Sequence, residues 1–134
     1  MSWSTSDISD SNLYIDGTGA FKFVSGETIY AGQAVYICNS NTVKVTTSLT
    51  GECDSIGIAS IDATSGNRIG VYTRGNVVRC CFDSDYNPST LVYATDDGLL
   101  TSSKGNATKV VGIVTDTPLI SIGGTNYVGS VMLY

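Results

Sequence analysis

The segment AVYICNSNTVKVT, residues 34–46, decides how the rest of the chain is interpreted. It begins with an apolar run that carries Tyr at its third position, passes through a polar Asn-Ser-Asn turn and returns in a run rich in β-branched residues. The segment LVYATDDGLLTSS, residues 91–103, repeats this order at an offset of 57 residues. SIGIAS at 55–60 and VVGIVT at 110–115 then align at an offset of 55. Two similar units in one chain predict two pseudo-repeated halves of one fold.

Composition predicts the secondary structure of these units. The chain has 40 Val, Ile and Thr residues against 7 Leu, 7 Ala and 2 Glu, and β-branched side chains favour pleated strands over helices. Polar turns at 39–41 and 96–98 close two hairpins, and Gly98 suits the positive φ of a bulged turn. We therefore predict an all-β fold, a compact β-sandwich or β-barrel of short strands. The polar stretch 83–89 around Pro88 is the predicted crossover between the halves.

The expected strands are the apolar stretches between turn signals: 21–24, 28–30, 34–38, 42–46, 55–61, 68–73, 76–82, 90–94, 99–101, 109–115, 119–122 and 127–133. The first twelve residues, MSWSTSDISDSN, are too polar to fold alone. We therefore predict an extended N-terminal arm at 1–12 and a single β domain at 13–134. Trp3 is the only Trp of the chain, and Trp is enriched at binding hot spots. Two interpretations stay open for it: insertion into a neighbouring molecule, or folding back onto its own domain.

Residue types that the sequence lacks exclude most catalytic chemistry. The chain has no His, so Ser-His-Asp catalysis, Cys-His catalysis, histidine-ligated zinc and histidine pH switches are excluded. The acidic residues are scattered among turns and mark no acid–base pair for glycoside hydrolysis. The stretch 83–94 begins like a calcium loop, but Pro88 stands where that loop needs Gly and Ala94 where it needs Glu. We expect no enzymatic activity, no metal site and no cofactor.

Charge and hydropathy limit the partners. The 7 basic and 12 acidic residues give a net charge of −5, which opposes binding to nucleic-acid phosphates. No apolar run exceeds about five residues, whereas a helix that spans a bilayer needs about 20. Residues 1–10 lack the basic start and apolar stretch of a secretory signal. We therefore expect neither a nucleic acid nor a membrane as partner.

Cys38, Cys53, Cys80 and Cys81 show no CxxC spacing. We expect free and mostly buried thiols in a protein that assembles in a reducing compartment, with intracellular disulfides as the alternative for a hyperthermophilic source. Neighbours on a strand point to opposite faces, so Cys80 and Cys81 cannot both enter one core. One of the two is therefore a candidate for a subunit contact.

A longer pattern of glycines and short aliphatic strands covers residues 24–78. Its elements are Gly26, Gly32 before Ala34-Val35-Tyr36, a polar turn at 39–41, Gly57 between Ile56 and Ile58, a polar loop at 63–67, Gly70 between Ile69 and Val71, and Gly75. This succession resembles the small capsid decoration (cement) proteins of tailed bacteriophages and related head-tailed viruses. The resemblance marks the five glycines as structural positions of the family pattern.

The resemblance implies a non-enzymatic role in the virion. Copies would bind the outer surface of an icosahedral capsid, bridge neighbouring capsomers and stabilise the shell, with the major capsid protein as partner. It also implies a homo-oligomer, with a trimer favoured, that assembles in the host cytoplasm. In that role Trp3, Ser4 and Ile8 of the arm are the expected capsid contacts.

An alternative from another class is a carbohydrate-binding or fibre-like virion domain that contacts host glycans. Its basis is the 8 tyrosines together with many Ser and Asn side chains. Tyr36, Tyr72 and Tyr93 lie within apolar strands, however, where a tyrosine more often caps a core with its hydroxyl toward water. A core or interface role is therefore favoured for these three over a sugar-binding platform.

Overall fold

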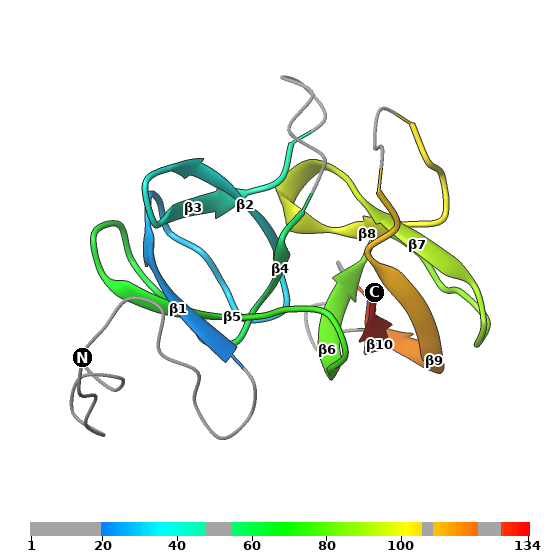
Figure 1. The fold of residues 1–134 in the computed structure, drawn as a ribbon. Coiled ribbons are helices and arrows are strands. Elements are labelled where there is room, and N and C mark those ends of the chain that lie inside the picture. Colours follow the sequence, from blue (N-terminus) through cyan, green and yellow to red (C-terminus); the bar gives the residue numbers. More distant parts are fainter. Residues whose placement is uncertain (1–19, 48–54, 106–108, 121–126) are drawn as a thin grey trace.

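The computed structural model describes residues 20–47, 55–105, 109–120 and 127–134, and within them the regular structure is ten strands and one 3-10 turn. The strands form two closed barrels that lie side by side (Figure 1). The first barrel has the order β1-β3-β2-β4-β5 and contains β1 (Ala20–Ser25), β2 (Ala34–Asn39), β3 (Thr42–Val45), β4 (Gly57–Ala59) and β5 (Arg68–Tyr72). The second has the order β10-β6-β8-β7-β9 and contains β6 (Val77–Phe82), β7 (Leu91–Ala94), η1 (Asp96–Gly98), β8 (Leu100–Thr101), β9 (Gly112–Ile120) and β10 (Tyr127–Leu133).

Every strand pairing of the first barrel recurs in the second. β1 runs parallel to β3 and β6 runs parallel to β8, while the other four pairings of each barrel are antiparallel. The register recurs as well, because Val35 pairs with Gly57 and Val92 pairs with Gly112. β6, β7, β8, β9 and β10 are thus the counterparts of β1, β2, β3, β4 and β5. The predicted all-β fold with two pseudo-repeated halves is confirmed.

Hydrogen bonds outside the strands repeat too. The Gly32 N–H donates to the Ala59 carbonyl at 2.9 Å, and at the equivalent place the Ser89 N–H donates to the Val114 carbonyl at 2.7 Å. Gly32 and Ser89 both have positive φ, at 95° and 75°. The two halves therefore keep the same backbone conformation even where the residue type differs.

Glycine is required where β4 approaches β5 and where β9 approaches β10. A Cβ on Gly57 would overlap the Tyr72 carbonyl oxygen, and a Cβ on Gly112 would overlap the Met132 carbonyl oxygen. Both glycines are buried. The Gly flanked by aliphatic residues, which the two sequence units share, thus marks a close backbone approach in each barrel.

Alternation along the strands builds two core clusters. The first barrel encloses Phe23, Ile29, Val35, Val43, Ala59, Ala63, Ile69 and Val71. The cluster of the second barrel includes Val78, Cys80, Phe82, Val92, Ala94, Leu100, Val114 and Val131, and it extends to Ala34 and Ile58 of the first barrel. The second core therefore reaches across the boundary between the barrels. The arm at 1–12 lies outside the described residues, and the single β domain at 13–134 stays a prediction.

The predicted crossover at 83–89 is wrong. The first barrel ends with β5 at Tyr72 and the second begins with β6 at Val77, so residues 73–76 join the halves. Residues 83–89 instead link β6 to β7, as the segment between β1 and β2 does in the first barrel. Polar composition marked a connector but did not reveal which strands it connects.

Two strand predictions also differ from the structure. Of residues 28–30, only Ile29 pairs with another segment, through an isolated β-bridge to Ala63. One bridge is not a ladder, so residues 28–30 do not form a strand. The stretches 109–115 and 119–122 contribute to one continuous strand, β9, with Pro118 inside it, and residues 121–122 lie outside the described part of the chain. β9 is longer than its counterpart β4 because it pairs with β10 as far as Ile120.

Candidate interaction site

The two barrels meet at a junction that hydrogen bonds hold together. Thr46 follows β3, is fully buried, and donates from its hydroxyl to the Thr95 carbonyl at 2.7 Å. The Gly98 N–H donates to the Thr46 carbonyl at 3.3 Å, and the Cys81 N–H donates to the Gly32 carbonyl at 3.1 Å. Backbone groups at the barrel surfaces, which burial would otherwise leave unpaired, are thereby satisfied.

The apolar part of the junction comes from the outer face of the first barrel. Ala34 and Ile58 are 0% exposed, and both belong to the core cluster of the second barrel. Tyr72 packs against the same cluster. Their neighbours Val35 and Ala59 point the opposite way and fill the first barrel. The second barrel therefore covers the outward side chains of β2, β4 and β5.

Gly98 allows η1 to reach this outer face. Its φ is +66°, which confirms the positive φ predicted for the bulged turn. A Cβ at Gly98 would also lie 2.8 Å from the Ala34 carbonyl oxygen and 2.8 Å from the Gln33 Cβ. The sequence predicts the turn conformation of Gly98 but not this second requirement, because the contact joins residues from different halves.

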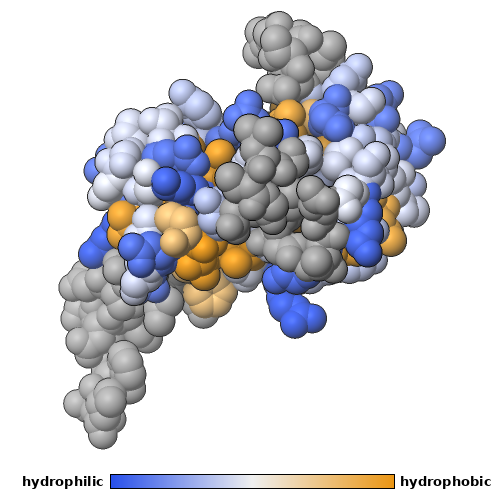
Figure 2. All heavy atoms as spheres, turned by 90° about the horizontal axis from the view of Figure 1, so that it is seen from above, coloured by the Kyte–Doolittle hydropathy of each residue, from blue (hydrophilic) through white to orange (hydrophobic). Residues whose placement is uncertain are grey.

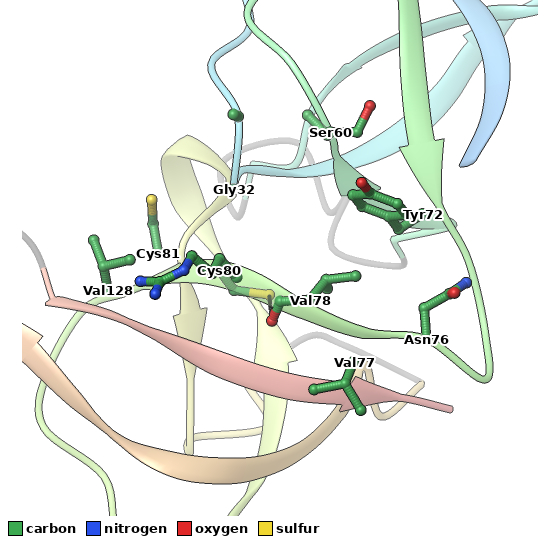
Figure 3. Close-up of a pocket in the computed structure, with 12 residues that line it drawn as sticks. Gly32, Ser60, Tyr72, Asn76, Val77, Val78, Cys80, Cys81 and Val128 are labelled. Carbon is green, nitrogen blue, oxygen red and sulfur yellow. Dashed lines mark hydrogen bonds between the residues drawn. The ribbon is translucent and has the colours of Figure 1, made fainter. Parts of the chain in front are cut away.

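A groove of about 510 Å³ opens between the barrels beside the junction (Figure 3). Figure 3 shows Tyr72 and Ser60 on one wall, with β6 across from them. Cys81 and Val128 lie toward one end, and Asn76 toward the other. The described residues that line the groove include no carboxylate. Its walls, mainly apolar with a few polar groups, suit an inserted side chain or a short peptide segment.

Cys80 and Cys81 line this groove from successive positions of β6. Cys80 is buried; burial, and secondarily the neighbouring Cys81, raise the pKa of its thiol. Burial also raises the pKa of Cys81, which is half-buried. Because the thiolate is the nucleophile, neither thiol is activated. One of the two enters the core, as predicted, and Cys81 lies between two barrels of the same chain.

The cysteines that the structure describes are free thiols, with Cys38 exposed. Cys53 lies outside the described residues. A second hollow, of about 610 Å³, also spans both barrels. Arg74, Lys109 and Tyr134 are exposed residues of its lining. Two positive charges thus meet at one hollow in a chain of net charge −5.

The structure brings together few of the site residues predicted from sequence. Trp3, Ser4 and Ile8 lie outside the described residues. The five pattern glycines lie at separate places: Gly26 beside the side chains of Thr42 and Lys44, Gly32 in the groove, Gly57 against β5, Gly70 buried within β5, and Gly75 in the link between the barrels. They position the backbone and do not form a common site.

The core or interface role expected for Tyr72 agrees with its packing at the junction, whereas the role of Thr46 was not predicted. Thr46 aligns with Ser103 in the repeat, and Met132 is the counterpart of Tyr72 by strand register. In each pair, the residue of the first half is the more buried. The aligned sequences do not reveal this difference, because burial here depends on the contact between the halves.

Neither a metal-binding cluster nor a membrane-spanning helix is found in the described part of the chain. No group of three or more Cys, Asp or Glu side chains in that part is arranged to hold a metal ion. The same residues include no helix with the length and apolar character to cross a membrane.

Comparison with known proteins finds likeness in fold and not in sequence. No protein-family model matches the chain, and no curated protein matches it in sequence. The fold is similar to the crystal structure of the head fiber gp8.5 N base in bacteriophage phi29, with a TM-score of 0.55 and 13% sequence identity. The likeness covers 84% of this chain and 92% of that one. At this identity it shows a shared fold: the paired barrels are an arrangement also found in a phage head fibre base.

Proposed function

We propose that the chain is a virion structural protein that binds the outer surface of an icosahedral capsid, bridges neighbouring capsomers and stabilises the shell. The observation that carries this proposal is the fold likeness to the phi29 head fiber base, which extends over 92% of that chain. The glycine and strand pattern at 24–78 supports the same setting, because it resembles capsid decoration proteins. Since a fold hosts many functions, the role needs a binding test.

The geometry suits attachment through several small contacts. Two barrels present separate faces to a partner, and hollows of about 510 Å³ and 610 Å³ lie between them. Figure 2 shows hydrophobic atoms at the surface among hydrophilic ones. Weak contacts at such faces and hollows, multiplied over a symmetric shell, give stable attachment without one large interface. The proposed partner is the major capsid protein of a head-tailed virus, and the proposed form is a homo-oligomer, with a trimer favoured.

The test is co-sedimentation of the purified chain with capsids of the virus that encodes it. The proposal predicts saturable binding at a copy number related to that of the major shell protein by a small ratio, and shells that withstand a higher temperature after binding. Capsids that sediment without the chain at saturating concentration would contradict it. Bovine serum albumin in the same gradient controls for trapping.

The arm is tested separately with the double variant Trp3→Ala, Ile8→Ala. We expect weakened capsid binding and an unchanged circular dichroism spectrum, because large apolar side chains anchor interfaces. Ser84→Ala, at an exposed position of the β6–β7 connector, is the matched control. Full binding by the double variant would remove the arm from the proposal and leave the barrels as the attachment surface.

A fibre-like role is the second candidate, because the similar structure is a fibre base. In that role few copies would attach per particle, and the copy number in the sedimentation experiment separates the two. A glycan platform is less well supported, since Tyr72 packs into the junction. A glycan array with no signal above background would eliminate host-glycan binding.

A further inference from the structure

The outward side chains of the first barrel form a row across its strands. Ala34 of β2 pairs with Ile58 of β4, and Ile58 pairs with Tyr72 of β5. We call these three residues the junction row, because all three pack against the core cluster of the second barrel. This row is the surface by which one barrel of the chain docks on the other.

The second barrel carries the same row in the same register. Leu91 of β7 pairs with Ile113 of β9, Ile113 pairs with Met132 of β10, and Met132 pairs with Val77 of β6. We call these four residues the exposed row. Val77 is 61% exposed, Leu91 and Met132 are 41% exposed, and Ile113 is half-buried. Four adjacent apolar side chains thus face solvent where the first barrel has an interface.

The other side of the junction has a partly exposed counterpart, in which Phe21 also packs against the core cluster of its own barrel. Val78 and Ala94 are 7% and 3% exposed and belong to the cluster that contains the junction row. Their counterparts by strand register in the first barrel are Phe21 and Ile37. Phe21 is half-buried, and Ile37 is 50% exposed. We call Phe21 and Ile37 the receiving end of the first barrel.

We propose that the exposed row docks on the receiving end of a second copy of this chain, in a contact that repeats the junction between the two barrels of one copy. The second copy is the occupant that the structure supports, because the first barrel already packs in this way on a barrel of the same fold. The proposal stands on the repeat and does not depend on the capsid role.

The two surfaces belong to different barrels. The exposed row lies on β6, β7, β9 and β10 of the second barrel, and the receiving end lies on β1 and β2 of the first (Figure 1). A contact between different surfaces of identical chains is heterologous, so it propagates head to tail. The result is a ring where the rotation closes and a filament where it does not.

One difference in residue type between the two halves makes the proposed contact between copies weaker than the junction within one copy. Gly98 approaches Ala34 closely at the junction, and its counterpart by the repeat is Asn41, also at positive φ. The Asn41 side chain keeps a neighbouring backbone farther away than Gly98 does. We therefore expect association that depends on concentration, not a permanent complex.

Sedimentation velocity of the full chain, from micromolar to millimolar concentration, tests the proposal. The wild-type chain should form dimers and larger species as concentration rises. Met132→Glu in the exposed row and Ile37→Glu at the receiving end should each weaken association at least about tenfold, because each buries a charge in an apolar contact. Ile61→Glu, at a position 52% exposed and outside both surfaces, should associate like the wild type. Circular dichroism confirms folding, and Val77→Glu replaces Met132→Glu if the latter fails to fold.

Mixing the two variants distinguishes this contact from other self-association. Met132→Glu keeps an intact receiving end and Ile37→Glu keeps an intact exposed row, so an equimolar mixture should form dimers and nothing larger. A wild-type chain that stays monomeric throughout would overturn the proposal. Association of Ile37→Glu at wild-type strength would also overturn it, since that result indicates that two exposed rows meet each other.

Discussion

The two barrels share strand pairings, register and turn hydrogen bonds, yet they differ in what covers their outer faces. Ile58 of the first barrel is fully buried, while Ile113, in the same register position of the second, is half-buried. Inward positions in the middle of the barrels are alike: Val35 and its counterpart Val92 are both fully buried, because each barrel must fill its own interior. In this duplicated fold the interior repeats, and the exterior depends on the neighbour of each half.

The largest expected effect tests what the barrels have in common. Gly57→Ala and Gly112→Ala should each lower the free energy of unfolding by roughly 3 kcal/mol or more, because the new Cβ overlaps a backbone carbonyl that cannot move away. Urea unfolding followed by circular dichroism measures the loss. Gly66→Ala has open space around it at φ +87°, so it should lose only about 1 kcal/mol. Equal losses at Gly57 and Gly66 would show that the backbone moves to relieve the overlap at Gly57, and would contradict the close approach of β4 to β5.

The next effect tests the difference between the outer faces. Ile58→Ala should lower the free energy of unfolding by about 3 kcal/mol, because it opens a cavity in a fully buried site. Ile113→Ala should lower it by about 1 kcal/mol, because solvent already reaches that side chain. The measurement uses dilute protein, so that no contact between copies contributes. Losses of the same size would mean that the second barrel does not cover the first.

A smaller effect tests the polar part of the junction. Thr46→Val keeps the shape of the side chain but removes the hydroxyl that donates to the Thr95 carbonyl, which should lower the free energy of unfolding by about 1–2 kcal/mol. Thr46→Ser should restore most of it. Ser103 is the exposed repeat counterpart of Thr46, and Ser103→Ala should change stability by less than about 0.5 kcal/mol. A neutral Thr46→Val would contradict the assigned hydrogen bond.

The smallest expected effect concerns the reaction rates of the cysteine thiols and not the stability of the fold. In a Cys53→Ser background at neutral pH, Cys38 should react with a thiol reagent at least about tenfold faster than Cys81, and Cys80 should not react before unfolding. Burial raises the pKa of Cys81, so its thiolate, and hence its reaction rate, should rise only as the pH becomes alkaline. Mass spectrometry of labelled peptides follows each site. Rapid labelling of Cys81 at neutral pH would indicate that the junction opens.

Sequence predicted the interior of the molecule better than its exterior. The offsets of 57 and 55 residues identified the hairpins and the glycines at 57 and 112, because close packing constrains those residue types directly. The junction was missed, since Ala34 and Leu91 are both apolar residues that point outward, and only a neighbour decides which of them is buried. The crossover predicted at 83–89 was wrong for a related reason. Polar composition indicates exposure to water, but it does not indicate which strands a segment connects.

The strongest test is a cryo-electron microscopy reconstruction of the virus particle to which the chain is proposed to belong. Density for paired barrels is expected on the outer surface of the capsid, spanning neighbouring capsomers, with the exposed row of one copy against the receiving end of the next. A particle whose outer surface carries no such density would contradict the proposed function. Paired barrels whose exposed rows face solvent would contradict the contact between copies while leaving the capsid role intact.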